Sequence, residues 1–256
     1  MVETGVRITD ELRERLARGG RWVALTGAGV SAESGLATFR GPDGLWDGRN
    51  PFEIATPAAF EREPEEVWRF YAWRRAQAAA AEPNPAHRAL VALERASSDF
   101  LLVTQNVDGL HERAGSGNMV RLHGTLWRLR CTADGREFDD RRLDLDSTLR
   151  RCECGGVLRP AVVWFGEALP ADGWARAERA AAACDVMIVA GTSSLVYPAA
   201  MLPRVANAGG AWVVEVNPEP TELTSEVHER LAGPAGTVLP VLAGAARGPG
   251  AGVCAR

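Results

Sequence analysis

The stretch LTGAGVSAESGLATFRG, from Leu25 to Gly41, is rich in glycine and serine and follows a short apolar run that starts at Trp22. Trp22 to Thr26 has the composition of a buried strand, and Gly27-Ala28-Gly29 behind it would let the backbone approach a pyrophosphate. A lone G-x-G is a weak signal. A dehydrogenase would continue with a second strand and an acidic residue about 20 residues on. This chain continues FRGPDGLWDGRNP, which is full of turn residues. The sequence therefore predicts a nucleotide loop and disfavours a hydride-transfer enzyme.

Apolar strands and helical segments alternate along the rest of the chain. Strands are expected at 22–26, 99–104, 161–165, 186–190 and 212–216, helices at 8–19, 65–81, 85–95, 173–183 and 198–208, and a long ordered loop over 41–60. Strands that are apolar on both faces and separated by helices indicate a parallel sheet covered on both sides. We expect an α/β fold with a doubly wound, Rossmann-like parallel sheet, interrupted near 130–160 by a small polar module.

The composition is that of an ordinary globular protein, with 46% hydrophobic and 24% charged residues among 256. A net charge of −4 gives no electrostatic reason to expect nucleic acid or an anionic membrane as a partner. The charged N-terminal segment lacks the apolar core of a signal peptide, and no run of about 18 apolar residues could span a bilayer. Five cysteines without an export signal argue against a disulfide framework. These features predict a cytoplasmic protein.

Six short motifs occur in the order and spacing of the sirtuin family, which the chain resembles from about residue 10 to 245. They are GAGVSAESGLATFRG at 27–41, TQNVDGLHERAG at 104–115, LHGTL at 122–126, VVWFGE at 162–167, GTS at 191–193 and VNPE at 216–219. Sirtuins are NAD-dependent protein-lysine deacylases that consume NAD as a co-substrate, so the resemblance implies acyl-lysine proteins as substrates. It also implies that 1–256 forms one catalytic unit. The expected parts are a Rossmann-like NAD-binding domain (8–40, 97–128 and 160–245), a helical lid and acyl-pocket segment (41–96), a small zinc-ribbon-like module (129–159) and a disordered tail (246–256).

The resemblance assigns the NAD contacts to a phosphate loop, a lid and three strand ends. The lid aromatic Phe39 would shield the reactive ribose from water. Asn106 and Asp108 would contact the nicotinamide half, Gln105 the ribose, and the segments after 190 and 216 the adenosine half. The expected NAD-contacting residues are Gly27, Ala28, Gly29, Ser31, Phe39, Arg40, Trp46, Gln105, Asn106, Val107, Asp108, Gly191, Thr192, Ser193, Asn217, Pro218, Glu219 and Ala235.

His123, in LHGTL, is the catalytic residue that the resemblance implies. In the family reaction the acyl oxygen attacks C1′ of the nicotinamide ribose, nicotinamide leaves, and a ribose hydroxyl that attacks next must lose a proton. An imidazole that titrates near neutrality suits the general base. The other three histidines, His87, His111 and His228, are expected to be structural.

The helical segment 65–81 suggests which acyl group is removed. Tyr71 and Arg74 are three residues apart and share a helix face, and a guanidinium beside a phenol can bind a carboxylate at two points. The pair resembles the class III sirtuins, which remove succinyl, malonyl and similar acyl groups, as does the small residue Ala55. Weaker deacetylation is expected, because an acetyl group would leave Arg74 unpaired. The alternative is an arginine-rich solvated helix above a packed tyrosine. Arg75 points about 100° away and is expected at the surface.

The motif VVWFGE is expected to present an extended edge to which the substrate peptide adds as a strand. Its expected substrate-binding residues are Val163, Trp164, Phe165 and Gly166. An ordinary core strand over 162–165 is compatible with this role, since alternate residues can serve each purpose.

A metal site is expected in the polar module. Sirtuins usually carry two C-x-x-C pairs that bind a structural zinc, whereas this chain has Cys131-Thr-Ala-Asp134 and Cys152-Glu-Cys154. Three thiolates and the Asp134 carboxylate could still form a tetrahedral zinc site. The alternative is a module without zinc that packing and salt bridges hold together.

Two other functions compete with deacylation at the level of sequence. A mono-ADP-ribosyltransferase would attach ADP-ribose to protein instead of releasing 2′-O-acyl-ADP-ribose, and a non-catalytic NAD sensor would have no use for His123 or the Phe39 lid. All 29 basic residues are arginine, so the protein has no lysine side chain on which to act on itself. The oligomeric state is left open.

Overall fold

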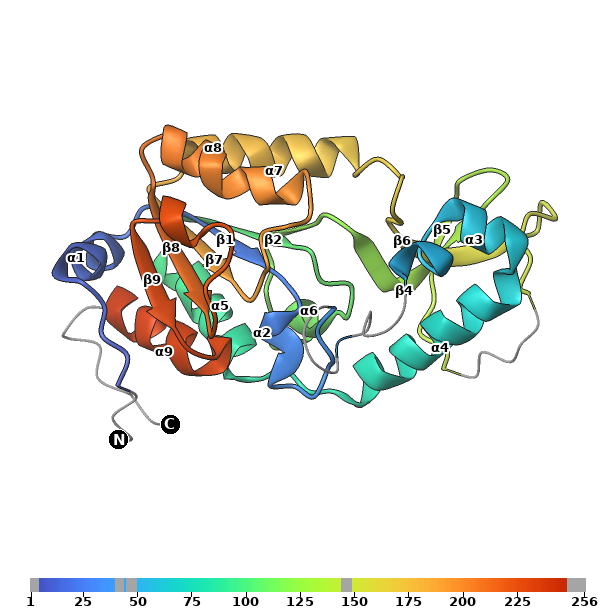
Figure 1. The fold of residues 1–256 in the computed structure, drawn as a ribbon, viewed down its shortest axis with the longest axis horizontal. Coiled ribbons are helices and arrows are strands. Elements are labelled where there is room, and N and C mark those ends of the chain that lie inside the picture. The colour runs from blue at the N-terminus through green and yellow to red at the C-terminus, as the bar shows by residue number, and fades with distance from the viewer. Residues whose placement is uncertain (1–4, 40–43, 45–49, 144–148, 248–256) are drawn as a thin grey trace.

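The computed structural model describes residues 5–39, 44, 50–143 and 149–247, and its larger part is a parallel sheet (Figure 1). The sheet order is β3-β2-β1-β7-β8-β9, with every neighbouring pair parallel. The strands are β1 (Arg21–Thr26), β2 (Asp99–Thr104), β3 (Met119–Arg121), β7 (Val186–Ala190), β8 (Trp212–Asn217) and β9 (Glu229–Ala232). The chain builds outward from β1 in one direction as far as β3 and then restarts at β7 on the other side. The switch point between β1 and β7 is where such sheets bind ligands.

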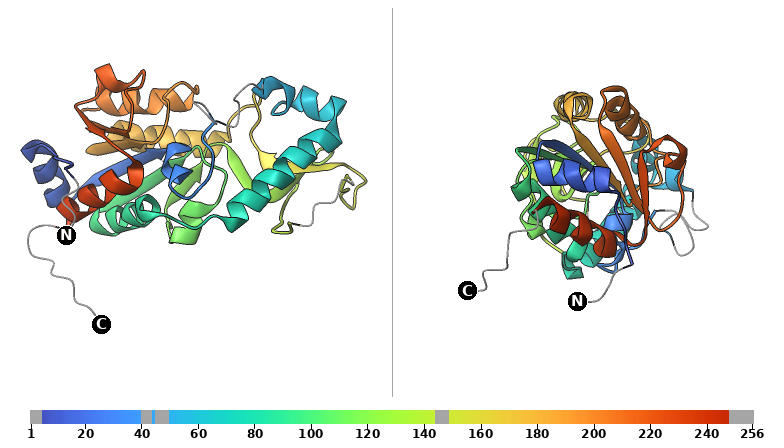
Figure 2. Two further views of the ribbon diagram at one scale, coloured as in Figure 1. Left: turned by 60° about the horizontal axis from the view of Figure 1, so that its bottom comes forward. Right: turned by 90° about the vertical axis from the view of Figure 1, so that its left-hand side faces the viewer.

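Helices cover both faces of this sheet, as the doubly wound prediction requires (Figures 1 and 2). One face packs against α1 (Asp10–Arg18), α5 (Pro85–Ala96) and α9 (Ala235–Ala246) through buried residues such as Leu16, Leu90 and Leu239. The other face packs against α7 (Ala171–Ala183) and α8 (Leu202–Ala208). The short helices α2 (Gly29–Ala32) and α6 (Leu110–Ala114) follow β1 and β2.

A smaller part lies beyond the carboxyl ends of these strands. It holds an antiparallel sheet in the order β5-β4-β6, made of β4 (Gly124–Cys131), β5 (Glu137–Asp139) and β6 (Leu158–Val162). Helices α3 (Pro57–Arg62) and α4 (Pro64–Ala80) pack on it around one apolar cluster. Within the described residues, no helix is long and apolar enough to cross a bilayer.

Two sequence-based predictions of local structure were wrong. The strand expected over 161–165 in the parallel sheet is β6, which covers 158–162 and pairs antiparallel with β4, because the inserted segment returns the chain beside β4. The loop expected over 41–60 contains a 3₁₀ turn (Pro51–Glu53) and the start of α3, whose Thr56 cap and Pro57 are ordinary helix-start signals. The tail predicted at 246–256 lies, from residue 248, outside the described residues.

Candidate active site

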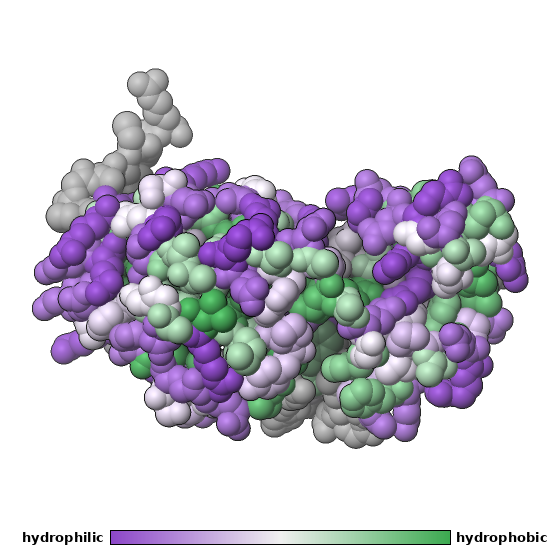
Figure 3. Space-filling model, turned by 90° about the horizontal axis from the view of Figure 1, so that it is seen from above, coloured by the Kyte–Doolittle hydropathy of each residue, from purple (hydrophilic) through white to green (hydrophobic). Residues whose placement is uncertain are grey.

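A cavity of about 1020 Å³ opens between the two parts of the molecule, at the carboxyl ends of β1, β2, β7 and β8. Figure 3 shows the surface hollowed between the two parts, with apolar residues along the hollow. Most of the residues predicted from the sequence line this cavity. They are Ala28, Gly29, Phe39, Ala55, Tyr71, Arg74, Gln105, Asn106, Val107, His123, Val163, Trp164, Phe165, Gly166, Gly191, Thr192, Ser193, Asn217 and Glu219.

Several other predicted residues lie elsewhere. Ser31 and Asp108 line a smaller adjoining cavity of about 110 Å³, which shares Phe39 and Asn106 with the large one. Gly27 and Pro218 line neither of these two cavities, and Ala235 belongs to the core under α9. The predicted lid residues Arg40 and Trp46 lie outside the described residues. Sequence reasoning missed further wall residues. Thr38 and Glu167 lie within two of the quoted motifs but were given no role, and no motif marks Leu169, Trp174, Leu195, Tyr197 and Thr221.

The loop after β1 packs directly on the loop after β7. The Gly29 N–H donates to the Gly191 carbonyl at 2.8 Å, and the Gly27 N–H donates to the Ala190 carbonyl at 3.0 Å. Gly191 has φ +61°, and a Cβ there would lie 2.4 Å from the Val30 nitrogen. The glycines are therefore needed for contact between the two loops. The Ala28 N–H has no acceptor within the described part of the chain, and Ala28 faces the cavity.

Hydrogen bonds hold the polar side chains at the ends of β1 and β2. The Asn106 amide donates to the Gly27 carbonyl at 3.0 Å and to the Ser31 hydroxyl at 3.3 Å. Ser31 Oγ in turn donates to Asp108 Oδ2 at 2.8 Å. Asn106 and Asp108 are each 7% exposed, so these bonds fix both side chains at the junction of the two cavities.

Thr192 connects the ends of three strands along the cavity edge. Its hydroxyl accepts from Gln105 Nε2 at 3.1 Å, and its carbonyl accepts from Asn217 Nδ2 at 2.9 Å. Residues that follow β2, β7 and β8 are thus fixed relative to one another, which gives one continuous polar edge for a long ligand.

His123 is held with one ring nitrogen toward the protein. Its Nδ1 lies 3.2 Å from the Gln105 carbonyl oxygen, which can only accept, so Nδ1 carries the proton and Nε2 keeps its lone pair. Burial lowers the pKa of His123, and the hydrogen bond to Gln105 opposes that shift in part. A neutral imidazole in the cavity wall, whose Nε2 has no hydrogen-bond partner among the described residues, has the form that a general base requires.

His87 and His111 are buried and packed ring to ring, with centroids 4.9 Å apart. His111 Nε2 contacts Thr26 Oγ1 at 3.0 Å, and His87 Nδ1 accepts from the Asn84 N–H in a capping box at the start of α5. Burial lowers the pKa of His87 to about 3 and that of His111 to about 4. Both stay neutral and support the loops around the cavity, in agreement with the structural role predicted for them.

Tyr71 and Arg74 of α4 reach the cavity together. The Tyr71 side chain is 3% exposed, and its oxygen accepts from Trp164 Nε1 at 2.8 Å. The Arg74 guanidinium lies 5.0 Å from the Phe39 ring centroid and 6.0 Å from that of Tyr71. Burial lowers the pKa of Arg74 from 12.5, and nearby Tyr71 and Asp108 oppose that shift. Among the residues described, no carboxylate lies within ion-pair distance of this guanidinium.

The prediction that Arg75 is a surface residue was wrong. Its side chain is 0% exposed and lies 2.9 Å from Asp140 Oδ1, whose side chain is 2% exposed. The partner lies 65 residues along the chain, in the segment after β5, so the helix pattern could not reveal it. The guanidinium also lies 5.5 Å from the Trp127 ring centroid.

The segment after β6 runs through Val163 and Trp164 into a turn at Phe165-Gly166, and its N–H groups bond within the protein. The Val163 N–H donates to the His123 carbonyl and the Phe165 N–H donates to the Ala55 carbonyl, each at 2.9 Å, and the Trp164 N–H donates to Glu167. In the described chain no donor reaches the carbonyls of Val163 and Phe165. A peptide that adds here would therefore donate its own N–H groups to those carbonyls.

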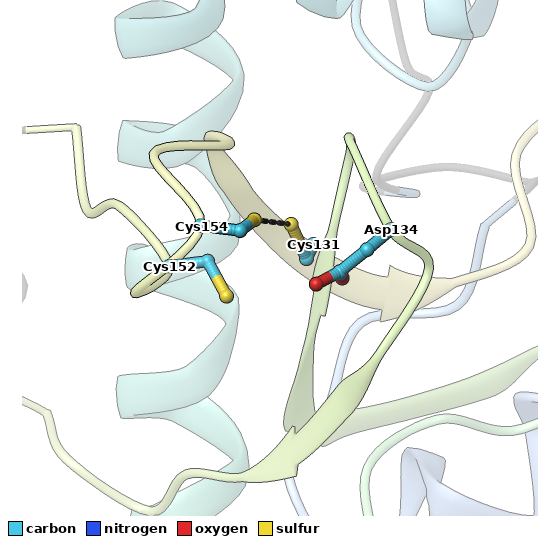
Figure 4. Close-up of side chains that lie close together, drawn as sticks. All are labelled: Cys131, Asp134, Cys152 and Cys154. Carbon is cyan, nitrogen blue, oxygen red and sulfur yellow. Dashed lines mark hydrogen bonds between the residues drawn. The ribbon is translucent and has the colours of Figure 1, made fainter.

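Three cysteines and one aspartate gather in the small module (Figure 4). The ligand atoms of Cys131, Asp134, Cys152 and Cys154 all lie within 4.8 Å of one another, with two of the sulfurs 3.4 Å apart. In a tetrahedral zinc site with Zn–S near 2.3 Å, neighbouring sulfurs are about 3.8 Å apart. The donor set and its size therefore fit zinc. Hydrogen bonds from Arg136 lower the pKa of Asp134 and keep its carboxylate ionised.

The parallel sheet and the cavity at its switch point define the class of protein. It is an α/β protein with a nucleotide-binding site across the carboxyl ends of its parallel strands. A model of the Sir2 family matches residues 27–198, and the chain belongs to this family. It is 53% identical over 223 residues to an NAD-dependent protein deacylase of Thermus thermophilus, and the match covers 86% of this chain and 87% of that one. It is 49% identical over 231 residues to NAD-dependent protein deacylase 1 of Archaeoglobus fulgidus, covering 90% and 94%.

Solved structures agree with this placement. The crystal structure of a Sir2 homologue–NAD complex matches with a TM-score of 0.89 and 47% identity, covering 94% of each chain. A Sir2–p53 peptide–NAD⁺ complex matches with a TM-score of 0.76 and 30% identity, covering 93% and 96%. The chain is an NAD-dependent protein deacylase of the sirtuin type, and its co-substrate is NAD.

Proposed function

We propose that this deacylase prefers acyl groups that end in a carboxylate, such as succinyl and malonyl, over acetyl. The observation that carries the proposal is the Arg74 cation, which lies in the cavity wall 6.0 Å from the Tyr71 ring centroid with no carboxylate partner among the described residues. A half-buried guanidinium without a counter-ion is costly, and an anionic ligand would relieve that cost. Ala55, which is 5% exposed, lies in the same cavity wall, and its small side chain leaves room for an acyl chain longer than acetyl.

The remaining roles follow from the cavity. NAD would lie along the polar edge from Ala28 to Asn217, with its nicotinamide half toward Asn106 and Asp108 and its ribose near His123. The Nε2 atom of His123 would accept the proton of a ribose hydroxyl, while Phe39 excludes water from the reacting carbon. The Sir2–p53 peptide complexes among similar structures support an acyl-lysine protein as the second substrate.

The zinc cluster would play no part in these steps. Cys131, Cys152, Cys154 and Asp134 would hold a structural zinc ion that fixes the ends of β4 and β6 of the small sheet. The products would be nicotinamide, the free lysine and 2′-O-acyl-ADP-ribose.

The test compares one peptide carrying succinyl-lysine or acetyl-lysine, with wild type and Arg74→Met. Wild type should show the higher kcat/KM on the succinyl peptide. Arg74→Met should lose roughly tenfold to hundredfold on that substrate, the size of a charge-assisted hydrogen-bonded pair. Arg69→Met is the matched control, because Arg69 lies on the same helix but pairs with Glu66 in solvent.

Two results would contradict the proposal: an acetyl preference in wild type, or a succinyl-to-acetyl ratio in Arg74→Met equal to that of Arg69→Met. Mass spectrometry of the products separates deacylation from ADP-ribosyl transfer, since only transfer leaves ADP-ribose on protein.

A further inference from the structure

We propose that Trp164 is a specificity-positioning residue, which makes Tyr71 an obligatory hydrogen-bond donor toward the acyl group. An indole N–H can only donate, so the 2.8 Å contact from Trp164 Nε1 occupies an acceptor site on the Tyr71 oxygen. The inference rests on the proposed acyl preference and goes beyond it, because Trp164 acts through Tyr71 and not by touching the acyl carboxylate.

The Tyr71 hydroxyl proton is available to a ligand in the cavity. No acceptor for the Tyr71 O–H is found among the described residues, and the side chain lines the cavity. Burial raises the pKa of Tyr71, so the phenol keeps its proton at neutral pH. The hydroxyl can then satisfy its proton only with an acceptor in the cavity.

Trp164 is itself held from three sides. Its indole ring lies 3.4 Å from the Arg159 guanidinium carbon, its main-chain N–H donates to Glu167 at 2.8 Å, and its ring packs on Phe60 with centroids 5.3 Å apart. Arg159 binds both carboxylate oxygens of Glu167, at 2.6 and 2.8 Å, and also donates to the Val162 carbonyl. Burial alone would raise the pKa of Glu167, but these hydrogen bonds outweigh burial and lower that pKa. The bidentate ion pair therefore persists at neutral pH.

The consequence is that Arg74 and Tyr71 both offer hydrogen-bond donors to the cavity. Arg74 presents a cation and Tyr71 presents a proton, and the acceptor site that could have received an N–H is already filled by Trp164. A carboxylate satisfies both donors, whereas a methyl terminus satisfies neither and an amino-terminated acyl group meets repulsion from Arg74. The indole nitrogen thus contributes to selection through its hydrogen bond to Tyr71 and not through a bond to the acyl carboxylate.

The experiment is a double-mutant cycle with Trp164→Phe and Tyr71→Phe, read as the ratio of kcat/KM for succinyl and acetyl peptides. Trp164→Phe keeps a ring against Arg159 but removes the N–H, and it should lower the ratio about threefold to tenfold, the size of one neutral hydrogen bond. The loss should appear mainly in KM for the succinyl peptide. In the Tyr71→Phe background the same change should leave the ratio unaltered, because Tyr71 no longer transmits it.

Trp22→Phe is the matched control, since Trp22 is equally buried on β1 and its indole nitrogen has no hydrogen-bond partner among the described residues. Should Trp164→Phe fail to fold, Glu167→Gln is the second variant, because Glu167 holds both Arg159 and the Trp164 main-chain N–H. It should also lower the succinyl-to-acetyl ratio. An unchanged ratio in Trp164→Phe, or an equal loss with and without Tyr71, would overturn the inference. If wild type itself prefers acetyl, the proposed function fails instead.

Discussion

The buried Arg75–Asp140 pair gives the sharpest stability prediction. Asp140→Asn keeps the size of the side chain but leaves the Arg75 charge without a counter-ion in a site where Arg75 is 0% exposed. Breaking a buried ion pair by removing one partner costs about 3–5 kcal/mol. The Asp140 carbonyl would remain as an acceptor for Arg75, so we expect the lower end, about 3 kcal/mol.

Urea unfolding followed by far-ultraviolet circular dichroism measures this loss as a lower midpoint with an unchanged slope. Adding Arg75→Met to Asp140→Asn should recover part of the stability, because the buried Arg75 charge is then gone, whereas Arg142 and Arg150 still lack the Asp140 carboxylate. Glu14→Gln is the control, since Glu14 pairs with Arg18 in solvent with 62% of its side chain exposed, and it should cost at most about 0.5 kcal/mol.

The pH dependence of this loss has a definite sign. Burial alone would raise the pKa of Asp140, but hydrogen bonds from Arg142 and the charge of Arg75 outweigh it and lower that pKa. The stabilisation is therefore complete above the unfolded value of about 3.9 and is lost as pH falls through the lowered pKa. Wild type and Asp140→Asn should converge in strong acid. A difference no larger than that of Glu14→Gln at neutral pH would refute the reasoning.

Two further predictions concern the base and the metal. Burial lowers the pKa of His123 below 6.5, so kcat/KM should stay constant down to pH 6.5 and fall only at lower pH. His123→Asn should lower the rate about 10²–10⁴-fold. A fall of kcat/KM centred at or above pH 6.5 would contradict this assignment. Purified protein should contain one zinc per chain by atomic absorption, Cys131→Ser should lose it and lower Tm, and Asp134→Cys should slow its release to a chelator. Metal-free wild type with unchanged Tm would count against a zinc site.

Local sequence patterns predicted much of the fold. The helices expected at 8–19, 65–81 and 85–95 are α1, α4 and α5, with ends shifted by one or two residues. Periodicity and caps suffice for α1 and α5, because they depend on neighbours three or four residues apart. The same holds for β1 and β2, whose apolar runs are unbroken, and for the cavity residues that directly follow each strand.

Pairing between distant segments was beyond such patterns. The apolar run over 161–165 fits either sheet, and only the pairing of β6 with β4 shows that this part of the chain is antiparallel. Likewise, helix geometry separates Arg74 from Arg75 by about 100° but does not tell which of the two meets solvent.

The sequence by itself determined the strands β1, β2, β7 and β8, the helices α1, α4, α5 and α7, the motifs that end at the cavity and the four candidate zinc ligands. Tertiary structure decided which charges are satisfied. Arg75 finds Asp140 in a distant segment, whereas Arg74, one residue earlier, finds aromatic rings and an open cavity. The physical reason is that the energy of a buried charge depends on partners brought together only by folding. The same side chain at adjacent positions therefore forms a buried ion pair at one and lines the cavity at the other.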